Sequence, residues 1–135
     1  MSAYKEVKVN FKKQYQHILV SALQELGYTV EVSEKAKQLF GFHGDARQQV
    51  ANVIIRREQL GSASNDVGWQ WKQDGSCVAH ISDYDGKRVF GKAVQNKLAC
   101  KYAELFIKES AAKNGWQLSE FVEEKGAVTV YAIAY

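Results

Sequence analysis

The chain has 135 residues, of which 46% are hydrophobic and 24% are charged, and its formal net charge is +3. This length and composition are those of one soluble globular domain spanning residues 1–135. No apolar run approaches the ~20 residues that cross a bilayer, and the first residues lack the apolar core of a signal peptide. We therefore expect no membrane segment and a cytosol-like compartment. The mild positive charge permits an acidic partner without requiring one.

The chain opens with a strand pattern followed by a helix pattern. Residues 4–11 alternate in polarity, and the face that carries Val7, Val9 and Phe11 is the expected core face. Residues 13–26 carry apolar side chains at offsets of three and four, which predicts an amphipathic helix.

Short elements with turns between them are expected next. We expect a strand at 28–32, a polar turn at 33–37 and a short strand at 38–42. Asp45, with Gln48 three residues later, predicts the cap of a short helix. The segments that complete this middle part are an interior strand at 50–57, a loop at 61–66, and strands at 67–72 and 76–81 joined by a turn at Asp74-Gly75.

The last third predicts a long helix and a hairpin. The helix covers residues 88–114, and strands at 118–123 and 128–135 flank a turn at 124–126. Helical runs stop at Gly27 and at Gly115, and an aromatic residue and a strand follow each glycine, because glycine closes a helix without steric penalty. The order is strand, helix, strand, a short strand, three strands, helix and two strands. We expect an α+β fold with a mainly antiparallel sheet and two amphipathic helices on one face.

Few residues of the chain converge in a catalytic or metal-binding pattern. Cys77 and His80 have C-x-x-H spacing, but residues three apart on a strand point to opposite faces, so we expect no zinc site. His80 could meet Asp83 and Asp85 where its strand ends, and an imidazole beside carboxylates could act as acid or base. An aspartate-rich turn explains the same residues without chemistry. Phosphate-binding and nucleophile motifs are absent from the sequence.

Three functional classes therefore stay open. A protein-binding adaptor would use the glycine-bounded loop from Phe42 to Arg47 and exposed strand edges near Trp69 and Trp71. An enzyme would gather His43, Arg47, His80 and Asp83 around one cleft. A module for RNA or other single-stranded nucleic acid would combine cations with the two tryptophans as stacking surfaces, although the tryptophans also suit a helix-covered core. The cations are Arg47, Arg56, Arg57, Lys87 and Arg88.

Several short segments, in order, resemble one family. They are Ala22-Leu23-Gln24-Glu25-Leu26-Gly27-Tyr28, Gly41-Phe42-His43-Gly44, Ala51-Asn52-Val53-Ile54-Ile55, Asp66-Val67-Gly68-Trp69 and Ala111-Ala112-Lys113-Asn114-Gly115-Trp116. Over nearly the whole chain, their order and spacing are similar to the hypothetical chloroplast reading frame family. Its members are small proteins of cyanobacteria, red-algal plastids and some other bacteria, catalogued as a domain of unknown function. The chain departs from the pattern at Ala3, where many members carry histidine, and at His80, where we expect aspartate.

The resemblance implies an accessory role, and it implies neither a catalysed reaction nor a cofactor. Members are similar to accessory proteins found beside an AAA-type ATPase and a ferredoxin-like protein. The resemblance thus implies a protein partner and a location in the cytoplasm or the plastid stroma. A last strand that reaches the end of the sequence could lie at a sheet edge and pair with a second copy as a homodimer. Our leading interpretation is a non-enzymatic adaptor that acts by protein–protein contact.

Overall fold

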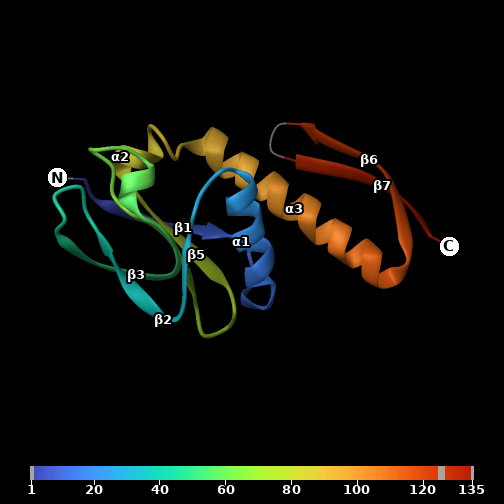
Figure 1. Ribbon diagram of the computed structural model, residues 1–135, viewed down its shortest axis with the longest axis horizontal. Coiled ribbons are helices and arrows are strands. Elements are labelled where there is room, and N and C mark those ends of the chain that lie inside the picture. The colour runs from blue at the N-terminus through green and yellow to red at the C-terminus, as the bar shows by residue number, and fades with distance from the viewer. Residues whose placement is uncertain (1, 125–126, 135) are drawn as a thin grey trace.

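The structure is a computed structural model, which describes residues 2–124 and 127–134, with side chains described through residue 117. It has an α+β fold, as predicted, with a five-stranded antiparallel sheet in the order β1-β5-β4-β3-β2 (Figure 1). The elements are β1 Tyr4–Val9, α1 Gln16–Glu25, β2 Glu31–Phe40, β3 Ala46–Ile55, β4 Val67–Trp71, β5 Cys77–Ser82, α2 Asp83–Gly86, α3 Lys92–Asn114, β6 Trp116–Glu124 and β7 Ala127–Ala134, with 3-10 turns at Lys13–Tyr15 and Arg57–Gln59.

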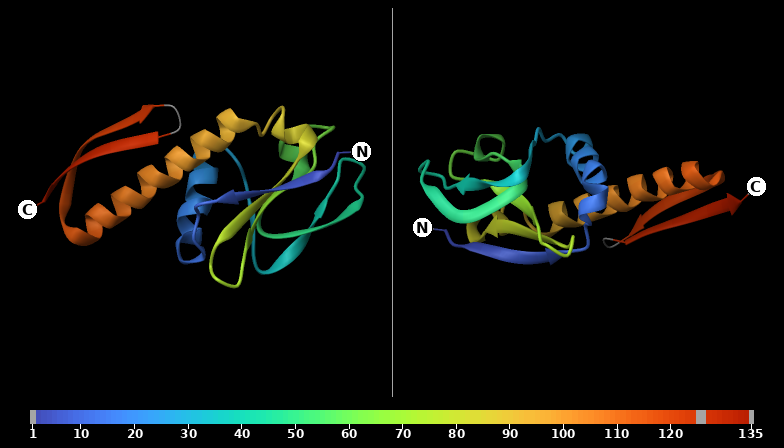
Figure 2. Two further views of the ribbon diagram at one scale, coloured as in Figure 1. Left: turned by 180° about the vertical axis from the view of Figure 1, so that it is seen from behind. Right: turned by 90° about the horizontal axis from the view of Figure 1, so that it is seen from below.

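Helices α1 and α3 cover one face of this sheet, as the amphipathic patterns predict (Figure 2). Leu19 and Leu23 of α1 pack with Phe90, which precedes α3, and with sheet residues such as Trp69 and Ile81. Burying each such side chain stabilises the fold by roughly 1.5–3 kcal/mol. The apolar face of residues 13–26 is therefore the main local reason why this helix packs on the sheet.

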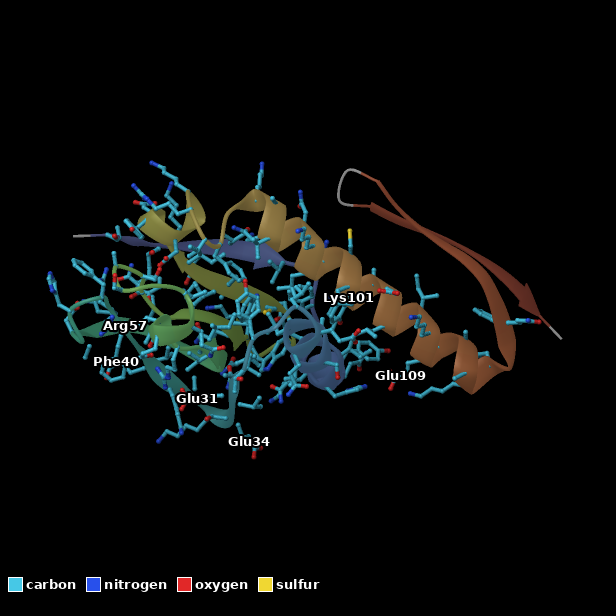
Figure 3. All side chains as sticks on the ribbon, turned by 45° about the horizontal axis from the view of Figure 1, so that its top comes forward. Glu31, Glu34, Phe40, Arg57, Lys101 and Glu109 are labelled. Atoms are coloured by element: carbon cyan, nitrogen blue, oxygen red, sulfur yellow. The ribbon has the colours of Figure 1, made fainter. Side chains whose placement is uncertain are left out.

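A hydrogen-bonded contact and an ion pair join the two helices at the rim of that core. His17 Nε2 lies 2.9 Å from a Glu109 carboxylate oxygen, and Lys101 Nζ lies 3.8 Å from Glu25. Figure 3 shows Lys101 and Glu109 on the same stretch of α3, and Glu109 lies near α1. Both contacts are partly exposed to solvent, so each contributes little stability.

The N-terminal predictions are confirmed. Val7 and Val9 of β1 pack against the core, and Phe11 is buried in it. The predicted helix at 13–26 begins as the 3-10 turn Lys13–Tyr15 and continues as α1. The two glycine stops are also confirmed, because Gly27 and Gly115 have φ angles of 99° and 70°, in the left-handed region.

Strand β2 corrects the predicted turn at 33–37. Those residues continue one ten-residue strand, and its register with β3 shifts between Val32 and Lys37. The Asn52 amide donates hydrogen bonds to the carbonyl oxygens of Ser33 and Glu34, at 3.1 and 2.9 Å. A buried partner on the neighbouring strand thus satisfies the irregular backbone, so the polar run forms a bulge rather than a turn.

The predicted short helix at Asp45 is also wrong. Strand β3 starts at Ala46, and Gly41 N–H donates to the Asp45 carbonyl oxygen at 2.8 Å, closing a tight β2–β3 turn. Gly44 takes a φ angle of 76° inside this turn. The Asp45 carboxylate lies 3.5 Å from the Arg47 guanidinium and caps no helix.

The predicted helix at 88–114 begins four residues late, at Lys92. The short helix α2 precedes it, capped by Ser82, whose Oγ accepts from Asp85 N–H at 3.1 Å. The Phe90 N–H donates back to the Asp85 carbonyl oxygen at 2.8 Å, which turns the chain before α3.

The C-terminal hairpin forms, but it does not join the five-stranded sheet. Strands β6 and β7 pair with each other as a separate antiparallel two-stranded sheet that lies along α3 (Figure 1). Residues 125 and 126 of the predicted turn, and Tyr135 of the predicted last strand, lie outside the described residues. Among the described residues, no helix is long and apolar enough to cross a membrane.

A close approach requires glycine at position 68 of β4. Gly68 lies against Ala51 and Leu39, which belong to a second, smaller core cluster. A Cβ on Gly68 would lie 2.5 Å from the Ala51 Cβ and 3.1 Å from a Leu39 methyl group. We expect Gly68→Ala to lower the free energy of unfolding by about 1–3 kcal/mol through overpacking. Urea unfolding measures this, with Gly86→Ala as control, because a Cβ at Gly86 meets Ile81 at an ordinary 3.6 Å. Equal losses in the two variants would contradict the packing explanation.

Candidate functional site at the loop end of the sheet

Four segments that are distant in sequence meet at one end of the five-stranded sheet. They are the start of β1, the β2–β3 turn, the loop at 61–66 and the β5–α2 junction. Asp66 N–H donates to the Phe40 carbonyl oxygen at 3.0 Å, and Asp83 N–H donates to the Ala3 carbonyl oxygen at 2.8 Å. The Arg47 guanidinium reaches the Ser2 carbonyl oxygen, so the β2–β3 turn closes onto the start of β1. This loop end is where the chain concentrates its buried polar groups.

The Asp66 carboxylate is the first of two buried acidic centres there. It is 1% exposed and accepts from the N–H groups of Phe40 and Arg57, at 2.8 and 2.7 Å. Its third donor is the Arg56 guanidinium at 2.8 Å, which also pairs with Glu31. Figure 3 shows Phe40 and Arg57 at the same end of the sheet. Burial lowers the pKa of Arg56, but the hydrogen bonds to Asp66 and Glu31 outweigh it and raise the pKa overall.

The Asp85 carboxylate is the second centre, and it is fully buried. Its Oδ2 accepts from Asn65 N–H at 2.8 Å, from the Asn65 side-chain amide at 3.3 Å and from Ser82 Oγ at 2.8 Å. Its Oδ1 has no hydrogen-bond partner among the described residues. Asp85 thus accepts from neutral donors, whereas Asp66 is paired with a cation.

These centres fix the β2–β3 turn in place. The Phe42 N–H donates to the Asn65 side-chain oxygen at 3.0 Å, and Asn65 is itself held by Asp85. The Phe42 and His43 rings contact each other at a tilt of 38°, with centroids 3.8 Å apart, and His43 is exposed. Gly41 leaves room for the Asp45 carboxylate, whose Oδ1 would lie 2.6 Å from a Cβ at that position. The turn therefore presents a pair of rings in a fixed position.

A pocket of about 410 Å³ lies beside Phe42. Its walls include Phe42, Asp83, Tyr84, Lys87 and Arg88. The Arg88 guanidinium lies 4.0 Å over the Tyr84 ring and donates to the Tyr84 carbonyl oxygen at 3.1 Å. Asp83 is paired with Lys5 at 3.3 Å. Two exposed cations beside two rings suit an anionic or acidic partner.

Tyr4 and Arg47 connect the pocket region to the Asp66 centre. The Tyr4 hydroxyl donates to the Asp66 carbonyl oxygen at 2.6 Å, and the Arg47 guanidinium lies 5.2 Å over the Tyr4 ring. Burial raises the pKa of Tyr4, and the negative charge of Asp66 adds to this, so the phenol stays protonated. Arg47 serves the closure of the loop end, since only 12% of its side chain is exposed.

Of the predicted site residues, Trp69 lies in the core and Trp71 packs against it, partly buried. Trp69 is 1% exposed and packs at 5.7 Å from Phe90, and Trp71 donates its indole N–H to the Gln16 side chain. The predicted exposed strand edges near them are wrong, because β4 is the middle strand and pairs with both β3 and β5. The alternative explanation of the two tryptophans, a helix-covered core, is the one confirmed.

His80 lies apart from the other predicted site residues. Its Nε2 is 2.9 Å from the Gln70 side-chain oxygen, and its Nδ1 has no hydrogen-bond partner among the described residues. Cys77 faces the helix-covered core, so it and His80 lie on opposite faces of β5. Burial raises the pKa of the Cys77 thiol to about 12, which leaves it an unreactive thiol. No group of three His, Cys, Asp or Glu in the described part of the chain could hold a metal ion.

The burial of His80 predicts a pH dependence of stability. Burial lowers the pKa of His80, and the nearby Lys72 also lowers it, although Glu6 opposes this. As the pH falls through the ordinary value near 6.5, the unfolded chain therefore takes up the proton first, and stability falls. We expect His80→Gln to remove a slope of at most about 1.4 kcal/mol per pH unit from the unfolding free energy between pH 7 and 5. Exposed His43→Gln is the control, and an unchanged slope in His80→Gln would contradict the burial of a neutral ring.

The predicted residues that do meet at the loop end are Phe42, His43, Arg47, Arg56 and Asp83. Sequence reasoning missed the residues that hold them there. The composition of residues 61–66 predicts only a loop at Asn65 and Asp66, and no sequence motif marks Tyr84 as a site residue. The available signal was a run of polar residues directly before a buried strand, but the same run is typical of an exposed loop.

The α+β architecture defines a small domain that has buried polar groups and a pocket of about 410 Å³ at one end of its five-stranded sheet. Residues 22–131, more than three quarters of the chain, match the family described as "Protein of unknown function (DUF1257)". The chain therefore belongs to that family. Comparison with curated proteins gives no match, and comparison with solved structures gives none either.

Proposed function

We propose that this protein is a non-enzymatic adaptor that binds a protein partner through the turn surface, defined as Phe42, His43, Tyr84, Lys87 and Arg88. The observation that carries the proposal is the bond from Phe42 N–H to buried Asn65, which displays the ring pair rigidly beside the pocket. A preorganised surface loses little conformational entropy on binding. A rigid surface of this kind can bind a partner without catalysing a reaction.

The cations of the turn surface define the partner chemistry. Lys87 and Arg88 are exposed and lie in the pocket wall, whereas Asp83 is already paired with Lys5. An acidic segment with an aromatic or aliphatic side chain would pair with the cations and place its apolar group against Phe42 and Tyr84. The first partner to test is an AAA-type ATPase, which the family resemblance implies, in the cytoplasm or the plastid stroma.

The two other classes have less support from this geometry. The RNA-binding alternative needed Trp69 as a stacking surface, and that ring is in the core. It also needed free arginines, but Arg56 pairs with Asp66 and Glu31. The enzyme alternative needed His80 in a shared cleft with His43, Arg47 and Asp83, whereas His80 bonds to Gln70.

Reversing the charge of the turn surface tests the adaptor proposal. We expect Lys87→Glu with Arg88→Glu to weaken partner binding at least tenfold, about 1.4 kcal/mol, because an acidic partner then meets two like charges. The partner is captured with the immobilised full chain, purified, and titrated by biolayer interferometry.

The matched control is Lys35→Glu with Lys37→Glu, which changes the net charge equally on exposed positions of β2. Equal weakening by both double variants would reduce the effect to net charge and contradict the site. A salt-sensitive gel shift with single-stranded RNA that only the Lys87/Arg88 variant loses would replace the adaptor with an RNA-binding module.

A further inference from the structure

A second surface lies away from the loop end, between β1 and α3. Strand β1 is an edge strand, and β5 is its one neighbour in the five-stranded sheet. A groove of about 640 Å³ runs between β1 and α3, lined by apolar side chains that include Val9, Phe11, Leu98 and Phe106. Its volume is in the range of sites that hold a ligand or peptide segment.

The groove has the architecture of a strand-addition site. An edge strand offers unpaired N–H and C=O groups, and a facing helix with apolar side chains holds every second side chain of an added strand. Buried core rings, Trp69 and Phe90, form part of the lining, so the groove opens onto the main core. Lys8 and Lys12 stand at its rim and are exposed. The added strand should therefore be apolar and carry acidic residues.

The chain itself contains a segment of this chemistry. Residues 116–135 hold 12 hydrophobic residues, three glutamates and one lysine, whereas residues 1–115 hold 17 basic and 12 acidic residues. The net charges are thus −2 for the C-terminal segment and +5 for the rest. Strands β6 and β7 form a two-stranded sheet, so both of its outer edges lack a partner strand within the described residues. An isolated two-stranded sheet is only marginally stable in water.

We propose that the β6–β7 hairpin of one copy adds to the free edge of β1 in a second copy and covers the groove between β1 and α3. Backbone hydrogen bonds extend the sheet, and the acidic excess of the C-terminal segment matches Lys8 and Lys12 at the groove. The exchange is reciprocal, so it closes into a symmetric dimer. Figure 2 shows the hairpin of one chain along the C-terminal half of α3, where its backbone extends beyond the five-stranded sheet.

The first test is the mass of the full chain in solution. Light scattering after size exclusion should give a concentration-dependent dimer of twice 15.2 kDa. Ala99→Arg places a long cation in the groove from an exposed helical position, and we expect it to raise the dimer dissociation constant at least tenfold. Ala93→Arg is the matched control on the same helix, exposed and outside the groove lining. A wild-type monomer at every concentration up to about 100 µM, or equal effects of the two variants, overturns the proposal.

The second test separates exchange between chains from closure within one chain. Copies labelled with ¹⁵N are mixed with unlabelled copies and treated with a carbodiimide, which joins a carboxylate to a lysine amine with loss of water. Mass spectrometry should find amide links from Lys8 or Lys12 to glutamates of residues 116–135 in peptide pairs of mixed isotope content. Links of a single isotope content only mean that the hairpin folds onto its own chain, and they overturn the dimer.

Discussion

Asp66→Ala is expected to lower the free energy of unfolding by about 3–5 kcal/mol, because one carboxylate holds three donors from two other parts of the chain, the end of β2 and the residues that follow β3. The variant leaves the N–H groups of Phe40 and Arg57 without an acceptor, and it leaves the Arg56 guanidinium without its buried partner. A loss of this size is a large share of the total stability of a small domain. Urea unfolding, followed by tryptophan fluorescence and by circular dichroism, measures it.

Glu31→Gln is the control for this prediction. Glu31 is the other partner of Arg56 but is about half exposed, so its loss should cost less than about 1 kcal/mol. Asp66→Asn should lie between the two, because an amide oxygen still accepts one backbone N–H but cannot pair with the charge of Arg56. A loss below 1 kcal/mol in Asp66→Ala would show that Asp66 does not hold the loop end together.

The sequence predicted the parts of this fold that depend on local periodicity. The apolar stripe of α1 and the alternation of β1 each report on one buried face, and the left-handed glycines at 27 and 115 report on one backbone angle. None of these signals needs a distant partner. Their success explains why the α+β class and the helix-covered face were predictable.

The wrong predictions all concern features that depend on a distant partner in the sequence. The run at 33–37 forms a bulge because Asn52, on the neighbouring strand, bonds to its carbonyl groups. Trp69 and Trp71 lie two residues apart and therefore share one face of a strand, which suits a buried core face or an exposed stacking surface equally well. Only the position of β4 in the middle of the sheet decides between them. Local patterns carry no information about which strand becomes an edge.

For the same reason, the sequence could predict the position of the candidate site but not the contacts that hold it. A glycine-bounded turn with an aromatic residue identifies a display position, and Phe42 and His43 occupy it. The rigidity of that display comes from Asn65, which lies 23 residues away from Phe42 in the sequence. Asp85, in turn, holds Asn65 from a separate junction. Contacts at such sequence separations form only when the sheet is assembled, so no local sequence motif predicts them.

The two buried carboxylates differ in charge environment, and this gives the second large prediction. Asp85→Ala should lower the free energy of unfolding by about 3 kcal/mol, because Asn65 N–H, the Asn65 amide and the Ser82 hydroxyl lose their shared acceptor. Asp85→Asn should stay within about 1 kcal/mol of the wild type, because its side-chain oxygen can replace Oδ2 and a neutral amide is easier to bury than a carboxylate. The same unfolding measurement compares the two variants.

The comparison decides what Asp85 contributes to the turn surface. If shape and hydrogen bonding are sufficient, Asp85→Asn keeps partner binding through Phe42, and Asp85→Ala weakens it as Asn65 becomes mobile. If asparagine is as destabilising as alanine, then Oδ1 has an essential donor that the protein side chains do not supply, and the neutral-acceptor explanation fails. Asp66 offers the contrast, since Arg56 makes its charge the essential property. The two aspartates at this end of the sheet thus hold the β2–β3 turn differently: Asp66 through a charge pair with Arg56, and Asp85 through hydrogen bonds from neutral donors.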